Sequence, residues 1–411
     1  MDTQLPPPGP ECSPFLSRQL WAYWKNPLDF LSNLANKYGD LALFKVGPQR
    51  ICLVNHPVYI EKILEGDQAC FAAESPIPAS GMENFGPAWL TCQDVGGFQE
   101  IDRFGLGLDD HRLAGFGSTT VTTALRVSDR WENLQNIDIR KEMRRLVFHI
   151  VVETFSGECD DERLEQLEGL AAKSRPDPFA MGLTLADCIH GLRFSKSKGG
   201  RSAETELHHR TVPCLAVCEP MVDLLAWTWR LLGEHPEAQA SLRAELDGLL
   251  MGQAPTLANL EGLVYTRMVV AEVLRLYPPV RLIRRVVIRD FSLAGYLISA
   301  SSALLISPWV MQRDPRYYPE AGRFDPQRWT SAIVDSRPRC AYLPFGGGAR
   351  ACPGEDLVLK MATLVLATLA QGWQFHLMPG QAKNLKTKAG QWPKNGVSMW
   401  IEKCKPNRNR L

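Results

Sequence analysis

Residues 345–354 read FGGGARACPG and lie directly before an apolar stretch, 355–371, that has the periodicity of a helix. Glycines allow the backbone to approach a flat cofactor closely. Cys352 precedes the helix, whose N-terminal dipole stabilises a thiolate, and Arg350 offers a charged donor to a carboxylate. A lone CPG sequence predicts only a glycine loop with a buried cysteine. A thiolate site is favoured because five informative positions occur in a fixed order: Phe345, Gly348, Arg350, Cys352 and Gly354.

The composition is that of an ordinary globular protein. Of 411 residues, 45% are hydrophobic and 22% are charged, and the net charge of +1 does not indicate nucleic acid or an anionic membrane as partner. The eleven cysteines are odd in number and form no C-x-x-C pair, which argues against a zinc site or a disulfide framework and favours a reducing compartment. The polar, proline-rich start has no signal segment, and no apolar run reaches the roughly 20 residues of a membrane helix. We therefore expect a cytoplasmic protein without a membrane segment.

The patterns along the chain predict a mainly α protein with a minor β component, in a single domain that covers residues 1–411. Runs of β-branched and aromatic residues between turn signals indicate strands. They predict a β-rich lobe formed by about residues 40–60, 285–306 and 372–401, and the helical lobe comprises the rest of the chain.

Three further motifs accompany the cysteine loop. EVLR holds Glu272 and Arg275 one helical turn apart, FDPQRW holds Arg328, and RLYPPVRLIRR ends at Arg285. Together with FGGGARACPG, these motifs resemble the cytochrome P450 superfamily of heme-thiolate enzymes. The resemblance implies that fold, with the glutamate and the first two arginines forming a buried network behind the cysteine loop. On its own, the EVLR pair would more often be a surface ion pair, whereas a buried glutamate is tolerable only when it is paired.

The resemblance also implies a cofactor and its contacts. The cofactor is heme b, iron protoporphyrin IX, with Cys352 as the axial ligand of the iron, whose electron donation favours O–O cleavage. Arg350 and Arg285 are implied to bind the porphyrin propionates. The other implied cofactor contacts are Phe345, Gly346, Gly354 and Ala216.

The predicted distal helix departs from the family pattern Ala/Gly-Gly-x-Asp/Glu-Thr. Aligned on LLAWTWRLL, the pattern falls on Ala216, Val217, Cys218, Glu219 and Pro220. The acid is retained, so the resemblance implies Glu219 as the distal catalytic acid. Valine replaces the glycine that makes room for dioxygen, and proline replaces the hydroxyl. Pro220 predicts a local kink because an internal proline costs a helix about 3 kcal/mol; a kinked core helix without catalytic meaning is the alternative.

Other positions also differ from the family. Residues 92–110 carry five acidic side chains against a single basic one, Arg103, where the family has a basic helix that docks an acidic electron-transfer protein. Residues 157–211 are short for the helices that roof the substrate pocket. We therefore expect a shortened roof that is open or is completed by a second protein or a large substrate. Gln312 stands where many relatives have a propionate-binding histidine.

These features predict a heme-thiolate oxidoreductase that monooxygenates an apolar small molecule, in specialised metabolism. The resemblance is close over about 1–90 and 215–411 and weak between them. A ferredoxin-type redox partner, or a second protein that completes the pocket, is the expected protein partner. The departures leave two alternatives open. One is peroxide-driven oxidation or an electron-free rearrangement on the same scaffold, and the other is a heme-binding auxiliary homologue with little catalysis of its own.

Overall fold

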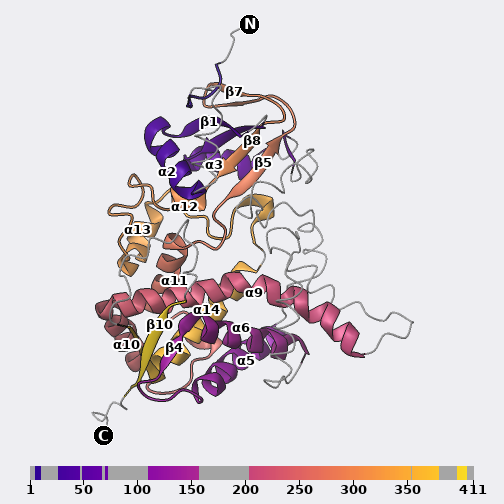
Figure 1. Ribbon diagram of the computed structural model, residues 1–411. Coiled ribbons are helices and arrows are strands. Elements are labelled where there is room, and N and C mark those ends of the chain that lie inside the picture. The colour runs from indigo at the N-terminus through magenta and orange to yellow at the C-terminus, as the bar shows by residue number, and fades with distance from the viewer. Residues whose placement is uncertain are drawn as a thin grey trace.

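The computed structural model describes residues 5–10, 26–46, 49–66, 70–72, 110–156, 203–352, 354–378 and 396–404. Helices predominate in this part of the chain, as expected (Figure 1). The α-helices are α2 (Pro27–Tyr38), α3 (Pro57–Glu65), α5 (Asp110–Ser128), α6 (Ile139–Ser156), α9 (Ala203–Glu234), α10 (Pro236–Leu250), α11 (Val264–Leu276), α12 (Pro308–Met311), α13 (Ser331–Asp335) and α14 (Glu355–Gly372). Short 3-10 helices are η6 (Leu257–Asn259), η7 (Pro326–Trp329), η8 (Arg339–Ala341) and η9 (Gly348–Arg350).

Proline begins four of the α-helices, namely α2, α3, α10 and α12. The residue suits this place because a first-turn N–H has no partner within the helix, and the fixed φ of proline is already helical. α2 ends at Gly39, whose φ of 81° is left-handed and whose N–H donates to Ala35 O at 2.8 Å. The sequence therefore fixes where these helices begin and turns the chain into the first strand.

The larger sheet has five strands in the order β1-β2-β8-β5-β3. An antiparallel hairpin, β1 (Leu41–Val46) and β2 (Gln49–Val54), extends through parallel pairing of β2 with β8 (Ala303–Ile306). β5 (Ile283–Val287) then pairs antiparallel with β8 and with β3 (Phe71–Ala72). A separate hairpin joins β6 (Phe291–Leu293) to β7 (Tyr296–Ile298). Two apolar clusters on this sheet seat α2 and α3, and β5, which carries Arg285, is buried along its whole length.

The helical part is organised around α9. Figure 1 shows α9 crossing the molecule between the part that holds β1, β8 and β5 and the part that holds α5 and α6. Its C-terminal half is buried in the largest apolar cluster, which also contains residues of α6, α11 and α14. Trp229 stacks on Phe375 with ring centroids 3.9 Å apart, and Trp227 stacks on Tyr277 at 3.7 Å. α9 is thereby held on both sides by aromatic packing.

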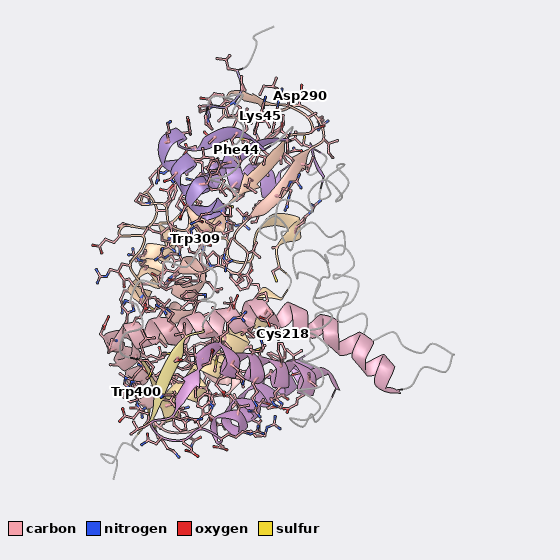
Figure 2. All side chains as sticks on the ribbon, viewed as in Figure 1. Phe44, Lys45, Cys218, Asp290, Trp309 and Trp400 are labelled. Atoms are coloured by element: carbon pink, nitrogen blue, oxygen red, sulfur yellow. The ribbon has the colours of Figure 1, made fainter. Side chains whose placement is uncertain are left out.

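The C-terminal strands lie elsewhere than the sequence grouping predicts. β9 (Trp373–Leu377) and β10 (Ser398–Lys403) form a separate three-stranded sheet with β4 (Asn136–Asp138). Their buried side chains belong to the cluster of the helices, and Trp400 lies among the helices in Figure 2, far from Phe44 and Lys45 in the larger sheet. The grouping of 372–401 with the β-rich lobe is therefore corrected. The apolar side chains of β9 pack against α9, so β9 and β10 belong with the helices and not with the larger sheet.

α9 is helical throughout its length, including the turn around Pro220. Its N-terminal turns include residues 203–211, which sequence analysis assigned to the roof region. Within the part of the chain that the structure describes, no helix is both long enough and apolar enough to span a membrane.

Candidate active site

The cysteine loop is a tight turn between η8 and α14. Gly346 and Gly348 have φ values of 78° and 68°, which an L-residue with a side chain rarely adopts. The Cys352 N–H donates to Phe345 O at 2.9 Å, so the loop closes on itself and leaves Cys352 half-buried. A Cβ on Gly348 would lie 1.9 Å from Leu64 O, at the end of α3. Glycine is therefore required for the loop to pack against α3.

The same loop leads into the N-terminus of α14. Gly354 is the residue directly before the helix, and Glu355 N donates to Cys352 O at 3.3 Å. The helix dipole places partial positive charge beside Cys352, which favours the thiolate over the thiol. Phe345 packs against the apolar cluster of the helices, and Arg350 is half-buried in η9. The structure thus brings together five of the predicted cofactor contacts: Phe345, Gly346, Arg350, Cys352 and Gly354.

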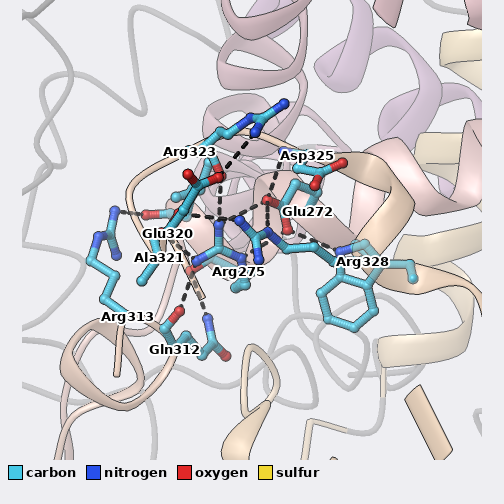
Figure 3. A network of polar contacts seen from close by, with 12 residues as sticks. Glu272, Arg275, Gln312, Arg313, Glu320, Ala321, Arg323, Asp325 and Arg328 are labelled. Atoms are coloured by element: carbon cyan, nitrogen blue, oxygen red, sulfur yellow. Dashed lines mark hydrogen bonds and ion pairs between the residues drawn. The ribbon is translucent and has the colours of Figure 1, made fainter. Parts of the chain in front are cut away.

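The predicted ion-pair network is confirmed. Glu272 and Arg275 on α11 are both fully buried, and the Arg275 Nε and Nη2 atoms each donate to the Glu272 carboxylate at 2.8 Å (Figure 3). Arg328 Nε lies 3.5 Å from the same carboxylate. A bidentate pair of this kind is among the stronger charge-assisted contacts. The motifs EVLR and FDPQRW therefore meet in space as the resemblance implies.

Backbone groups complete the network. Arg275 Nη1 donates to the carbonyls of Gln312 and Ala321 at 2.9 and 2.7 Å. Asp325 N and Trp329 Nε1 each donate to Glu272 at 3.0 Å. The hydrogen bond of Trp329 was not predicted from the sequence, although this residue stands next to Arg328 in the motif FDPQRW. These bonds compensate Glu272 and Arg275 for the hydration that they lose on burial.

Gln312 does not act as the expected counterpart of a propionate-binding histidine. It is fully buried at the end of α12, and its side chain amide bonds to backbone groups of α11 and of Leu343. Its two donors and its acceptor are therefore engaged within the protein.

Arg285 lies in the middle of β5 and is 1% exposed. Its Nη1 atom donates to Arg284 O at 2.9 Å. A guanidinium at this depth is stabilised by an anionic partner, because burial removes its hydration. A carboxylate group of a bound cofactor is an anionic partner of this kind.

Glu219 on α9 faces α6. Its carboxylate accepts from Arg140 Nη2 at 2.7 Å and from Arg144 Nη2 at 2.8 Å, and Arg140 Nε also donates to Asp223 at 2.8 Å. Although partial burial alone would lower the pKa of Arg140, the Asp223 and Glu219 carboxylates raise it above its usual value. The next residue, Pro220, is exposed. Neither arginine was predicted from the sequence, because both stand at least 75 residues earlier in the chain.

One face of the cysteine loop borders a cavity of about 620 Å³. Its lining combines the loop with the ends of α3, η8 and α14: Glu65, Arg339, Cys340, Tyr342, Leu343, Gly346, Gly347, Gly348, Ala349, Ala351 and Glu355. Burial, with a smaller effect of Asp356, raises the pKa of Glu355 above its usual value. The cavity therefore has a mixed polar rim with charges of both signs.

Some predicted positions lie outside the described residues. These are the acidic segment up to residue 109, residues 157–202 of the predicted roof, and the side chains of Ala216 and Val217. Cys218, the next residue of α9, is buried among the helices and is labelled in Figure 2.

A half-buried cysteine at a helix N-terminus, held by a glycine loop on a buried Glu–Arg–Arg network, defines the heme-thiolate class of site. Comparisons with known proteins agree with it. A family model described as Cytochrome P450 matches residues 216–399. Cyclooctatin synthase of Streptomyces melanosporofaciens is 27% identical over 404 residues, 87% of each chain. Pentalenene oxygenase of Streptomyces avermitilis is 26% identical over 401 residues, 87% of this chain and 89% of the relative.

Cyclooctat-9-en-7-ol 5-monooxygenase of Streptomyces melanosporofaciens is 27% identical over 426 residues, 90% of each chain. The chain belongs to the cytochrome P450 superfamily and is a P450-type oxidoreductase. At the general level its function is that of a heme-thiolate monooxygenase. The family implies a heme iron cofactor. The donor set described here fits one, because Cys352 offers a sulfur ligand and Arg285 offers a buried cation to a carboxylate substituent.

Proposed function

We propose that this protein inserts one oxygen atom into an apolar, largely hydrocarbon small molecule of specialised metabolism. The observation that carries the proposal is the cysteine loop, in which Cys352 is held at the N-terminus of α14 by its own backbone bond to Phe345. The names of two relatives describe oxygenation of pentalenene and of cyclooctat-9-en-7-ol, which supports an apolar substrate.

In this proposal each residue of the loop has a defined task. The Cys352 sulfur would bind the iron of heme b, and the dipole of α14 would keep that sulfur as a thiolate. Arg285 from β5 and Arg350 from η9 would bind the propionates. Phe345, Gly346, Gly354 and Ala216 would line the cofactor. When bound, heme supplies the iron at which dioxygen is activated.

The overall reaction sets what else the protein needs. Substrate, dioxygen, two electrons and two protons give the hydroxylated product and water. The electrons would come from a ferredoxin-type partner, and the protons must reach the distal side of the cofactor. Glu219 is the acid that we propose there, and its bonds to Arg140 and Arg144 hold its side chain in place against α6.

The first test is spectroscopic. The reduced, carbon monoxide-bound protein should show the red-shifted Soret band of thiolate ligation, and Cys352→Ser should lose it. Absence of this band from the wild-type protein would exclude the proposed function. Turnover is then measured with pentalenene and cyclooctat-9-en-7-ol, using ferredoxin, its reductase and reduced nicotinamide cofactor. No product under any condition would favour a heme-binding auxiliary role.

One observation favours peroxide-driven oxidation as the second candidate. Pro220 stands exposed where the family has a hydroxyl, and the neighbouring Glu219 carboxylate is bonded to two guanidinium groups. Proline has no hydroxyl proton to give, whereas hydrogen peroxide brings two electrons and two protons with its oxygen, so this second candidate does not need Glu219 as an acid. Turnover with peroxide should therefore exceed turnover with ferredoxin, and Pro220→Thr should reverse the order. Unchanged oxygen-driven turnover in this variant would show that the missing hydroxyl is irrelevant.

A further inference from the structure

We propose that Gln312 is a positioning residue that fixes the start of the cysteine loop relative to the buried pair of Glu272 and Arg275. The inference deepens the proposed function, because it rests on Cys352 being the iron ligand. Gln312 stands outside the cysteine loop and outside the ion-pair motifs, and it connects the two.

The side chain of Gln312 uses all of its polar hydrogens and its oxygen. Nε2 donates to Leu274 O at 3.0 Å and to Arg275 O at 2.9 Å. Oε1 accepts from Leu343 N at 2.7 Å. The residue is 0% exposed, so water does not replace any of these bonds.

The two carbonyls belong to the last turn of α11, where a helix has no N–H groups of its own to offer them. Gln312 therefore caps the helix that carries Glu272 and Arg275. The backbone of Gln312 takes part as well, since its carbonyl accepts from Arg275 Nη1 at 2.9 Å. Side chain and main chain together tie the end of α12 to the buried ion pair, as the close view of the network shows (Figure 3).

On the other side, Gln312 reaches the cysteine loop. Leu343, which it holds by the N–H, accepts from Gly346 N at 3.2 Å. Phe345, two residues further, accepts from Cys352 N at 2.9 Å. Gln312 thus anchors the chain two residues before the loop, and the Cys352 N–H closes the loop on Phe345. Two backbone hydrogen bonds, from Gly346 N to Leu343 O and from Cys352 N to Phe345 O, therefore connect the residue held by Gln312 with Cys352.

Only an amide satisfies these three groups. A glutamate carboxylate can accept from Leu343 N but offers no proton to the carbonyls of Leu274 and Arg275. A neutral histidine offers one donor and one acceptor. The substitution Gln312→Glu thus keeps the shape and removes both donors, while Gln312→His removes one.

A second buried glutamine provides a matched control. Gln239 on α10 donates through Nε2 to Phe375 O at 3.1 Å and accepts through Oε1 from Phe375 N at 2.9 Å. It is 9% exposed and bridges α10 to β9, so it has the same chemistry without any bond to the cysteine loop. Gln239→Glu therefore measures the general effect of placing a carboxylate at a buried glutamine.

The experiment combines amide hydrogen exchange with the spectrum of the reduced carbon monoxide complex. In Gln312→Glu, two buried carbonyls lose their donor and repel the carboxylate that holds Leu343 N, so exchange of the peptide covering 342–352 should rise by at least about tenfold. The share of protein with the shorter-wavelength Soret band, without thiolate ligation, should rise with it. Gln239→Glu should change neither readout in this peptide, even where it lowers the Tm.

Gln312→His keeps the inference testable if the glutamate variant does not fold, and it should give an intermediate effect. Equal exchange of the 342–352 peptide in the Gln312 and Gln239 variants would overturn the inference. A wild-type protein without the red-shifted band would instead overturn the proposed function, because the exchange measurement does not depend on heme. Faster exchange in 342–352 with an unchanged thiolate spectrum would also overturn a positioning role for Cys352.

Discussion

Replacing Glu272 by glutamine removes the negative charge at the centre of the buried network and keeps its shape. Arg275 then retains its contacts with backbone carbonyls but loses both charge-assisted bonds of 2.8 Å to the carboxylate. Both side chains are 0% exposed, so no water can approach to solvate the remaining guanidinium.

The size of the effect follows from this burial. Removing one partner of a buried ion pair costs about 3–5 kcal/mol, because the other charge stays in the interior without compensation. Proteins unfold with an entropy of about 2.1 cal/mol/K per residue, which is roughly 0.9 kcal/mol/K for 411 residues. The Tm of Glu272→Gln should therefore fall by about 4–6 °C.

The chain contains a surface pair with the same spacing as the buried one. Arg323 and Glu320 are also three residues apart, at 3.0 Å, but their side chains are 65% and 69% exposed. Glu320→Gln should therefore leave the Tm unchanged, because water solvates the arginine. Differential scanning calorimetry of the two variants in the same heme-loaded state measures the contrast. If the Tm of Glu272→Gln falls no further than that of Glu320→Gln, the buried pair does not stabilise the fold as argued.

Three other outcomes are expected. Gly348→Ala should lower the Tm and the heme content, because a side chain at φ 68° costs about 1–2 kcal/mol and its Cβ would collide with the end of α3. Gly372→Ala is the control, because a Cβ there meets nothing within 4 Å. Burial lowers the pKa of His376 more than the nearby Glu402 carboxylate raises it, so protonation of this histidine below about pH 6.5 favours the unfolded state. Between pH 7 and pH 5 the Tm of His376→Gln should therefore fall less than the Tm of the wild-type protein, and an equal fall contradicts this. Arg140→Gln leaves Glu219 bonded to Arg144 and should change the pH profile of turnover; an unchanged profile would contradict the proposed role of Glu219.

The residues of short motifs were the most predictable part of the site. Cys352, its glycine loop and the Glu272–Arg275–Arg328 network could be identified because each needs a particular residue type at a particular spacing. The boundaries of α2 and the start of α10 were predictable for a related reason: proline begins both helices, and Gly39 ends α2 by local backbone geometry.

Contacts between distant segments could not be predicted in this way. Arg140 and Arg144 stand in an amphipathic helix where arginines are common, and nothing near them in the chain indicates Glu219 as their partner. Gln312 stood out in the sequence only as a departure from the family, and its three bonds could not be predicted because a buried amide and a surface amide look alike in the sequence. The separate sheet of β9 and β10 depends on pairing with β4, more than 200 residues earlier.

The parallel pairing of β2 with β8 has a consequence for synthesis of the chain. β2 ends at Val54 and β8 begins at Ala303, so about 250 residues must be made before the N-terminal hairpin finds its neighbour. At about 5–20 residues per second, this takes about 12–50 s on a ribosome. During that time the open edge of β2 can pair with other chains. The time of translation therefore sets how long this edge stays open, whatever the stability of the finished fold.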